Sequence, residues 1–411
     1  MMSLQQVATV EANAEALYGS LHEAPELSNQ ERNTAKSLAA QLKGLGFEVH
    51  EGIGGFGVIG VLENGPGKFV MLRTDTDALP IEEQTGSVKK SHVRALDESS
   101  QDVPVMHACG HDLHMAAWVG AAQYLSQHRR AWKGKLMFVA QPAEEKLTGA
   151  RALIKDGLFT RFGRPDAAVA IHVHDQLPLG QIGYTLGPFA AAANNVDLTV
   201  YGRSGHGAYP QNAIDPIVIA SRIVLSLQTI VSRETDPSQP LVVTVGSIHG
   251  GTKHNSIPDS VKLELTVRSY KREVQDRALA AIQRIAKAEA EVAGAPMAPL
   301  MTVREGVSPA VSDPALTKHL VDVLGRGKDG ITFVEIPKEM GSEDFAEYGA
   351  VTPTVMLQVG VVDPEKYKQS KEGGSPLPSL HSSQFLPSMP DALKYAIWTN
   401  VNAVLTLLGG Q

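Results

Sequence analysis

The chain has 411 residues, 43% of them hydrophobic and 20% charged, which excludes a disordered chain and suggests two or three domains at roughly 150 residues each. The formal net charge is −7, from 37 Lys and Arg against 44 Asp and Glu, so we expect no binding to nucleic acid or to an anionic membrane. A single cysteine excludes an intrachain disulfide framework. We also find no apolar run of about 20 residues and no signal-peptide pattern, and the three observations together favour a cytoplasmic protein.

The first part of the chain alternates between helical and strand patterns. Apolar residues recur at helical spacing over 7–22 and 32–45, where Gly46 follows as a stop signal. Short apolar runs, typical of strands buried on both faces, then alternate with further helices. We expect strands at 58–62, 69–73, 135–140 and 167–173, and helices at 112–128 and 149–156. This alternation predicts an α/β layer with a mostly parallel sheet.

The pattern changes near Gly187 and Pro188. Alternating strands and two long helices follow in the order β-α-β-β-α-β, which predicts a ferredoxin-like sandwich with both helices on one face of an antiparallel sheet. These elements are expected at 196–201, 216–230, 241–248, 261–270, 272–292 and 301–304. The fold class is therefore α/β, with a domain of residues 1–187 and 306–411 that is interrupted by an α+β domain of residues 188–305. A final helix is expected at 390–408.

Gly55, Gly57 and Gly60 match the GxGxxG pattern of dinucleotide-binding loops. Such a site requires a helix directly after the glycines, so that the helix N-terminus faces the pyrophosphate. Here Gly60 is followed by a strand pattern that ends at Gly65. We therefore interpret the motif as a β-hairpin.

The densest chemical signal is a cluster of four potential metal ligands within eight residues: His107, Cys109, His111 and His114. Thiolate and imidazole are preferred donors for zinc-like ions, and a carboxylate such as Asp112 can fix the tautomer of a neighbouring histidine. The alternative is a buried cysteine beside surface histidines. The density of the cluster favours a metal site.

A pair of glutamates, Glu144 and Glu145, directly follows the expected strand at 135–140. Adjacent side chains on extended backbone point to opposite sides, so one carboxylate could bind metal while the other acts as a general base. An isolated acidic pair is usually a solvated loop. Beside the His-Cys cluster, the catalytic interpretation is the stronger one.

Three further regions present histidines or polar residues. His172 lies on the apolar run at 167–173, with His174 as the competing candidate, and His381 lies near the C-terminus. His206 lies in a glycine-rich loop at 202–210. In isolation, each of these is more often structural than functional. Asn255 begins the polar segment 255–259 that precedes the strand expected at 261–270.

Together and in this order, these motifs resemble the M20 metallopeptidase superfamily. Within it, the chain looks most like the branch of N-acyl-amino-acid amidohydrolases, which includes hippurate hydrolase, auxin-conjugate hydrolases and aminoacylase-like carboxypeptidases. The matching stretches are 22–28, 72–80, 106–114, 141–145, 171–173, 205–206, 255–259, 340–345 and 381.

The resemblance implies a catalytic domain that holds two divalent metal ions, interrupted by a lid and dimerisation domain. It makes Glu144 the general base and Asp77 the aspartate that orients a ligand histidine. It also assigns His206, Asn255 and Arg268 in the lid to the substrate carboxylate or the oxyanion. The implied metal ligands are Cys109, His111, Glu145, His172 and His381.

The implied reaction is hydrolysis of the amide bond of small N-acyl amino acids, with zinc or manganese as the metal and cobalt or nickel as alternatives. The resemblance also implies a homodimer formed through the inserted domain, with His206 reaching the partner's metal site. Two other interpretations remain: an amidase with Cys109 as nucleophile, and a non-catalytic metal- or peptide-binding module. Segments 87–103 and 146–148 depart from the superfamily's pattern, so the sequence leaves the acyl group and the amino acid open.

Overall fold

The computed structural model describes residues 1–304, 306–326 and 330–409. The chain divides into two compact units, each with its own sheet and core. Unit 1 comprises Met1–Gly187, Val311–Pro337 and Asp344–Gln411, and unit 2 comprises Pro188–Ala310 and Lys338–Glu343. The boundary expected at residue 305 lies outside the described residues.

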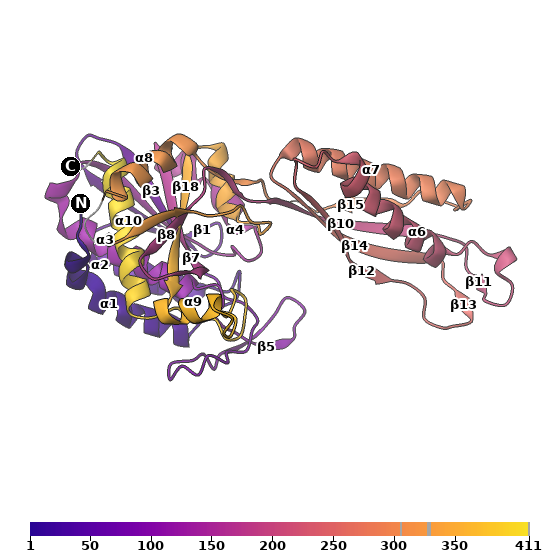
Figure 1. Ribbon diagram of the computed structural model, residues 1–411, viewed down its shortest axis with the longest axis horizontal. Coiled ribbons are helices and arrows are strands. Elements are labelled where there is room, and N and C mark those ends of the chain that lie inside the picture. The colour runs from indigo at the N-terminus through magenta and orange to yellow at the C-terminus, as the bar shows by residue number, and fades with distance from the viewer. Residues whose placement is uncertain (305, 327–329, 410–411) are drawn as a thin grey trace. The chain divides into compact units, whose positions relative to one another are not determined.

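Unit 1 is built on an eight-stranded mixed sheet, which confirms the α/β class (Figure 1). In sheet order its strands are β1 (Glu48–Ile53), β2 (Gly57–Asn64), β6 (Gly134–Gln141), β3 (Phe69–Asp75), β7 (Ala167–Pro178), β18 (Thr354–Val362), β8 (Gln181–Tyr184) and β17 (Thr332–Glu335). The central strands β6, β3, β7 and β18 pair in parallel. The expectation of a mostly parallel sheet holds only there and at the β8–β17 edge, because β1–β2, β2–β6 and β18–β8 are antiparallel.

Unit 1 has eight α-helices among its described residues, and one of them, α3 (His111–Gln127), supplies much of its core. They are α1 (Leu4–Glu23), α2 (Arg32–Gly44), α3 (His111–Gln127), α4 (Gly149–Lys155), α5 (Leu158–Phe162), α8 (Pro314–Leu324), α9 (Pro364–Lys371) and α10 (Asp391–Leu407). Helix α3 contacts α1, α2, α10 and strand β3, and nearly all of its side chains are buried. At Gly120 a Cβ atom would lie 2.8 Å from Ile397 Cδ1, so glycine permits the close approach of α3 and α10. This extensive packing holds α3 in place, and with it His111, the first residue of the helix.

The glycine motif at residues 55–60 lies in the antiparallel hairpin formed by β1 and β2. Gly54 and Gly55 make the turn with φ of 60° and 108°, a backbone region that favours glycine. No helix follows, so the hairpin interpretation is confirmed and the nucleotide interpretation is excluded.

Unit 2 has the expected β-α-β-β-α-β order. Its four-stranded sheet runs β12 (Leu241–His249), β14 (Ser260–Ser269), β10 (Ala192–Tyr201) and β15 (Leu300–Val303), with every pair antiparallel. Helices α6 (Pro216–Thr229) and α7 (Arg272–Val292) pack on one face of this sheet through their buried apolar residues.

The short strands outside the two main sheets are distributed over both units. They are β4 (Arg94–Leu96), β5 (Asp102–Pro104), β9 (Gly187–Ala190), β11 (Gly205–His206), β13 (Ser256–Ile257) and β16 (Ala310–Ser312).

One stretch in the described part of the chain is long and apolar enough to cross a membrane. It covers Pro216–Glu234, where α6 continues into a π-helical turn, and has a mean hydropathy of 1.3. The expectation that no run reaches this length was therefore wrong. Ile219, Ile223 and Leu227 of this stretch are buried in the core of unit 2, as in a core helix of an α+β domain.

Candidate metal centre

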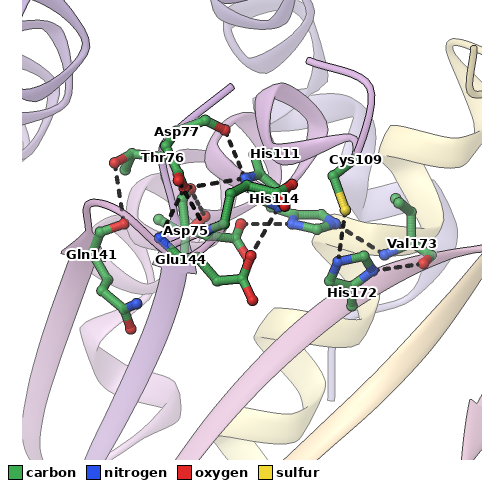
Figure 2. A network of polar contacts seen from close by, with 12 residues as sticks. Asp75, Thr76, Asp77, Cys109, His111, His114, Gln141, Glu144, His172 and Val173 are labelled. Carbon is green, nitrogen blue, oxygen red and sulfur yellow. Dashed lines mark hydrogen bonds and ion pairs between the residues drawn. The ribbon is translucent and has the colours of Figure 1, made fainter. Parts of the chain in front are cut away.

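Most of the predicted site residues of unit 1 lie around the ends of three neighbouring strands (Figure 2). Strand β3 ends at Asp75 and leads to Asp77, β6 leads to Glu144, and β7 carries His172. The parallel pairing of β3 with β6 and with β7 places their carboxyl ends at one edge of the sheet, where α/β proteins hold their ligands. Helix α3 begins at the same edge with His111.

Gly110 sets the geometry between Cys109 and His111. Its φ is 77°, and a Cβ atom there would lie 2.7 Å from Val173 Cγ2. Both facts require glycine at this position. The Cys-Gly-His sequence thus holds a thiol and an imidazole on either side of the sharp entry into α3.

Asp77 organises the polar groups of the site. Its carboxylate accepts hydrogen bonds from the backbone N–H groups of Glu144 (3.1 Å) and Glu145 (3.0 Å) and from the Ser28 hydroxyl (2.6 Å). Its backbone carbonyl accepts from His111 Nδ1 at 2.7 Å. Burial raises the pKa of the Asp77 carboxyl, but the hydrogen bond and charge of His111 outweigh that effect and lower it. Asp77 therefore stays ionised and positions both glutamates and His111.

The two glutamates lie on a turn, so the expected extended backbone was wrong. Ala143 and Leu147, on either side of them, have φ values of 53° and 56°, and Leu147 N donates to the Glu144 carbonyl at 2.6 Å. A left-handed residue that is not glycine leaves no mark in the sequence. The backbone leaves the strand direction at Ala143, and the hydrogen bonds of Asp77 to the next two N–H groups stabilise the turn.

The three predicted ligand histidines direct Nε2 atoms toward shared partners. His111 Nε2 lies 3.9 Å from Glu145 Oε1, and His381 Nε2 lies 3.4 Å from the same oxygen. His381 Nε2 is also 3.3 Å, and His172 Nε2 3.5 Å, from Cys109 Sγ. The Nδ1 atom of His172 donates to the Val173 carbonyl at 2.7 Å. The Nε2 atom of a neutral ring then carries a lone pair that can bind a metal ion. The structure thus brings together all five predicted ligands.

This group of side chains fits a divalent cation. His111 Nε2 and Glu145 Oε1 are buried and have no hydrogen-bond partner among the described residues, which is unusual for buried polar atoms. Burial lowers the pKa of His111, but the negative charge of Asp75 and the hydrogen bond and charge of Asp77 raise it to about 10. The surroundings of His111 Nε2 thus favour positive charge. Thiolate, imidazole and carboxylate are donors that zinc-like ions prefer.

His114, a potential metal ligand in the sequence, pairs with Asp75 beside the five predicted ligands, and the sequence did not predict this pairing. Asp75 accepts from His114 Nδ1 and from Arg73 Nη1, both at 2.7 Å, and all three residues are buried. Val173 N donates to His114 Nε2 at 2.9 Å, so both ring nitrogens of His114 are engaged. His114 therefore positions β7 and Asp75. The alternation of Arg73, Asp75 and Asp77 at every second residue was the signal that could have revealed this buried polar row.

Two other candidate histidines lie outside the group of five. His107 is buried, neither of its ring nitrogens has a hydrogen-bond partner among the described residues, and burial lowers its pKa to about 4. His174 Nδ1 accepts from Gln176 N at 3.1 Å. Of the two histidines considered on β7, His172 is the one whose ring approaches Cys109.

The three predicted substrate-binding residues lie in unit 2, at two separate places. His206 on β11 pairs with Ser256 on β13, and Gly207 N donates to the Asn255 carbonyl at 2.8 Å, so His206 and Asn255 are neighbours. Arg268 lies toward the end of β14 and donates to the Met340 carbonyl at 2.9 Å. Eight residues separate Ser260, at the His206 end of β14, from Arg268, which is roughly 26 Å along a strand. One unit 2 therefore presents these groups at opposite ends of its sheet.

Comparison with known proteins identifies a shared family. The profile of peptidase family M20/M25/M40 matches residues 71–373. An IAA-amino acid hydrolase of Arabidopsis thaliana (ILR1-like 2) is 36% identical over 345 residues, covering 84% of this chain and 75% of the relative. Thermostable carboxypeptidase 1 of Saccharolobus solfataricus is 35% identical, with 84% and 85% covered. N-acetyl-L-cysteine deacetylase of Bacillus subtilis is 34% identical, with 83% and 79% covered.

A solved structure shows the same fold. A Bacillus subtilis protein described as a dinuclear metal binding peptidase from the M20 family superimposes with a TM-score of 0.80 at 27% identity. The match covers 98% of this chain and 100% of that protein. The match therefore extends over both units.

Proposed function

The chain belongs to peptidase family M20/M25/M40, and from this membership we propose that it is a metal-dependent hydrolase of N-acyl amino acids. The products would be a carboxylic acid and a free amino acid. The observation that carries the proposal is the convergence of Cys109, His111 and Glu145 beside Glu144. Relatives named as amino acid conjugate hydrolase, deacetylase and carboxypeptidase support the class of amide.

The ligands of the proposed site would hold two divalent ions. They are Cys109, His111, Glu145, His172 and His381. When bound, such ions supply Lewis-acid polarisation of the scissile carbonyl and of the attacking water. Zinc and manganese are the metals we propose, with cobalt or nickel as alternatives. A chain with a single cysteine, Cys109, suits the reducing cytoplasm, where we place the protein.

Glu144 is the proposed general base. It is buried, and its carboxylate lies within 4.8 Å of ligand atoms of both His111 and Glu145. The carboxylate takes a proton from the attacking water while the water oxygen bonds to the amide carbon. As the C–N bond breaks, Glu144 delivers that proton to the leaving amine nitrogen. Asp77 acts as a positioning residue because it fixes the backbone of Glu144 and the ring of His111.

The substrate carboxylate and the oxyanion are assigned to His206, Asn255 and Arg268. The Nδ1 atom of His206 accepts from Ala208 N at 3.0 Å, so a neutral ring carries its proton on Nε2 and can donate it to an oxyanion. Arg268 supplies a guanidinium suited to a carboxylate. Because His206 and Arg268 lie at opposite ends of the unit 2 sheet, we propose that one site uses His206 from a partner subunit.

Unit 2 offers a surface for that homodimer. Strand β12 is an edge strand, and Ile217, Val218 and Leu225 on α6 are exposed. An unpaired edge strand beside apolar side chains can pair with a second copy around a two-fold axis. The partner for this surface is therefore a second copy of the chain, and the substrate is a small molecule.

The test is a turnover screen of the purified protein with N-acetyl, N-benzoyl and N-indolylacetyl amino acids, each with added Mn²⁺, Zn²⁺ or Co²⁺. We expect metal-dependent release of the free amino acid from one of these series and its loss on chelation. Chelator-resistant turnover that a thiol reagent abolishes would instead indicate a Cys109 nucleophile. Stoichiometric binding without turnover would indicate a binding module.

A further inference from the structure

Unit 1 contains a cavity of about 730 Å³ that lies apart from the metal centre. Its walls come from α1, the segment Thr85–Lys89, the ends of β7 and β18, and the loop Leu377–Pro390. None of the five proposed metal ligands lines it. Its volume is within the range of small-molecule sites.

The cavity combines apolar walls with two unpaired ammonium groups. Tyr18 and Phe385 contribute aromatic surface, and Lys89 and Lys366 contribute positive charge. Within the described part of the chain, neither lysine pairs with a carboxylate. A Cβ atom on Gly19 would lie 2.6 Å from Lys89 Nζ, so this ammonium lies directly against the cavity wall formed by α1.

Two of the acidic groups in the cavity wall are already engaged. Asp175 accepts from Leu380 N at 2.7 Å, and Asp363 accepts from the N–H groups of Glu365 (3.0 Å) and Lys366 (3.1 Å) at the start of α9. Glu15 is the third carboxylate that lines the cavity. The hydroxyl of Tyr18 is buried and has no hydrogen-bond partner among the described residues. The groups left to contact an occupant are thus the two lysines, the aromatic and aliphatic side chains, the Glu15 carboxylate and a few neutral polar side chains, which are Thr85, Ser87, Gln384 and Ser388.

The loop that covers the cavity also carries a proposed metal ligand. His381 has a φ of 61°, and its N–H donates to the Ala108 carbonyl at 2.9 Å. On either side, Leu380 is bound to Asp175, and the Ser383 carbonyl accepts from Gln84 N at 2.7 Å. An occupant that contacts this loop therefore contacts the support of His381.

We propose that this cavity binds a small amphipathic carboxylic acid. The carboxylate pairs with Lys89 and Lys366, and the apolar body packs against Tyr18, Phe385 and the prolines of the covering loop. Binding adds contacts to the loop Leu377–Pro390 and thereby stabilises the position of His381. The proposal concerns a second site and does not depend on the reaction proposed above.

Hydrogen exchange on the metal-loaded protein locates the binding site directly. The probe is 4-phenylbutyrate, with the uncharged 4-phenylbutyramide as its match. We expect the acid to slow exchange in 15–22, 85–89 and 377–390, and the amide to have no such effect at the same concentration. Protection confined to the peptides that contain Cys109 and Glu145 would place the acid at the metal centre alone and overturn the proposal.

Paired variants test the two lysines. In Lys89→Gln/Lys366→Gln the side-chain stems remain, and we expect calorimetric affinity for 4-phenylbutyrate at this site to fall at least about tenfold. The matched control is Lys90→Gln/Lys368→Gln, which removes the same charge from neighbouring lysines that do not line the cavity. Equal loss in both double variants, or no loss in the first, would show that the cavity lysines do not hold the carboxylate.

Discussion

At the scale of single residues, the site depends on how Glu144 and Glu145 are separated. They are consecutive, and Asp77 holds both of their N–H groups. Glu145 Oε1 lies near His111 and His381 and is a proposed metal ligand, whereas Glu144 is the proposed general base. The turn that starts at Ala143 therefore underlies the different roles that we propose for these two identical side chains.

Glu144→Gln tests the proposed base. The amide keeps the shape of the side chain but cannot accept a proton, so kcat should fall at least about 100-fold while metal content is unchanged. Steady-state kinetics and metal analysis of the same preparation measure the two effects. Turnover above a tenth of the wild-type rate would contradict the assignment.

Cys109→Ala tests the thiol that lies between His172 and His381. Removing it should lower the amount of bound metal, and added metal should restore only part of the lost activity. Cys109→Asp should retain more of both, because a carboxylate is also an anionic ligand for zinc-like ions. If Cys109→Ala keeps two tightly bound ions per chain, the thiol is not a ligand.

At the scale of elements, the sequence predicted the main strands and helices of unit 2 and the segments of β2, β3, β6 and β7 in unit 1, but it gave no positions for β1, β8, β17 and β18. Buried runs such as 135–140 and the long α7 are set by local apolar patterns, so they can be recognised without the fold. The expected strand direction at Glu144 failed because Ala143 adopts a conformation that its residue type does not signal. The role of His114 was missed because it depends on how α3 packs against β3 and β7, which only the tertiary structure reveals.

His22 of α1 connects the start of α3 with the loop that carries Glu83. Its Nδ1 lies 2.7 Å from Asp112 at the start of α3, and its Nε2 lies 3.2 Å from Glu83, whose carboxylate also accepts from Ser91 N at 2.6 Å. Burial lowers the pKa of His22, but the hydrogen bond and charge of Asp112, with those of Glu83, raise it to about 9. A protonated His22 thus balances two buried carboxylates.

His22→Gln should therefore destabilise the protein in a pH-dependent way. The folded pKa of about 9 exceeds the ordinary value of 6.5, so the stabilisation is complete below pH 6.5, declines as pH rises and is lost above about 9. We expect the unfolding free energy of the variant to lie about 3 kcal/mol below that of the wild type near pH 6.5, and this difference to shrink toward pH 9.5. Urea unfolding across this range measures it. The exposed pair of His50 and Glu48 provides the control, where His50→Gln should change stability by less than about 1 kcal/mol.

At the scale of the whole molecule, the proposed dimer can be tested by complementation. Homodimers of His206→Ala and of Glu144→Gln should both be nearly inactive. A hybrid of one chain of each would combine an intact Glu144 with an intact His206 from the partner, so it should regain close to half the wild-type rate. Hybrids of verified composition that show no recovery, while both parents are folded and metal-loaded, would place His206 in its own chain's site or outside the reaction.

The placement of β18 has a consequence for how the protein is made. This strand lies between β7 and β8 in the unit 1 sheet, yet it follows both segments of unit 2 in the chain. On the ribosome, unit 2 therefore emerges while β7 still lacks its neighbour on one side and His381 has not been synthesised. The exposed edge of β7 is apolar, and more than 150 further residues must be synthesised before β18 can pair with it. Nascent chains of this protein should thus depend on chaperones most strongly during the synthesis of unit 2.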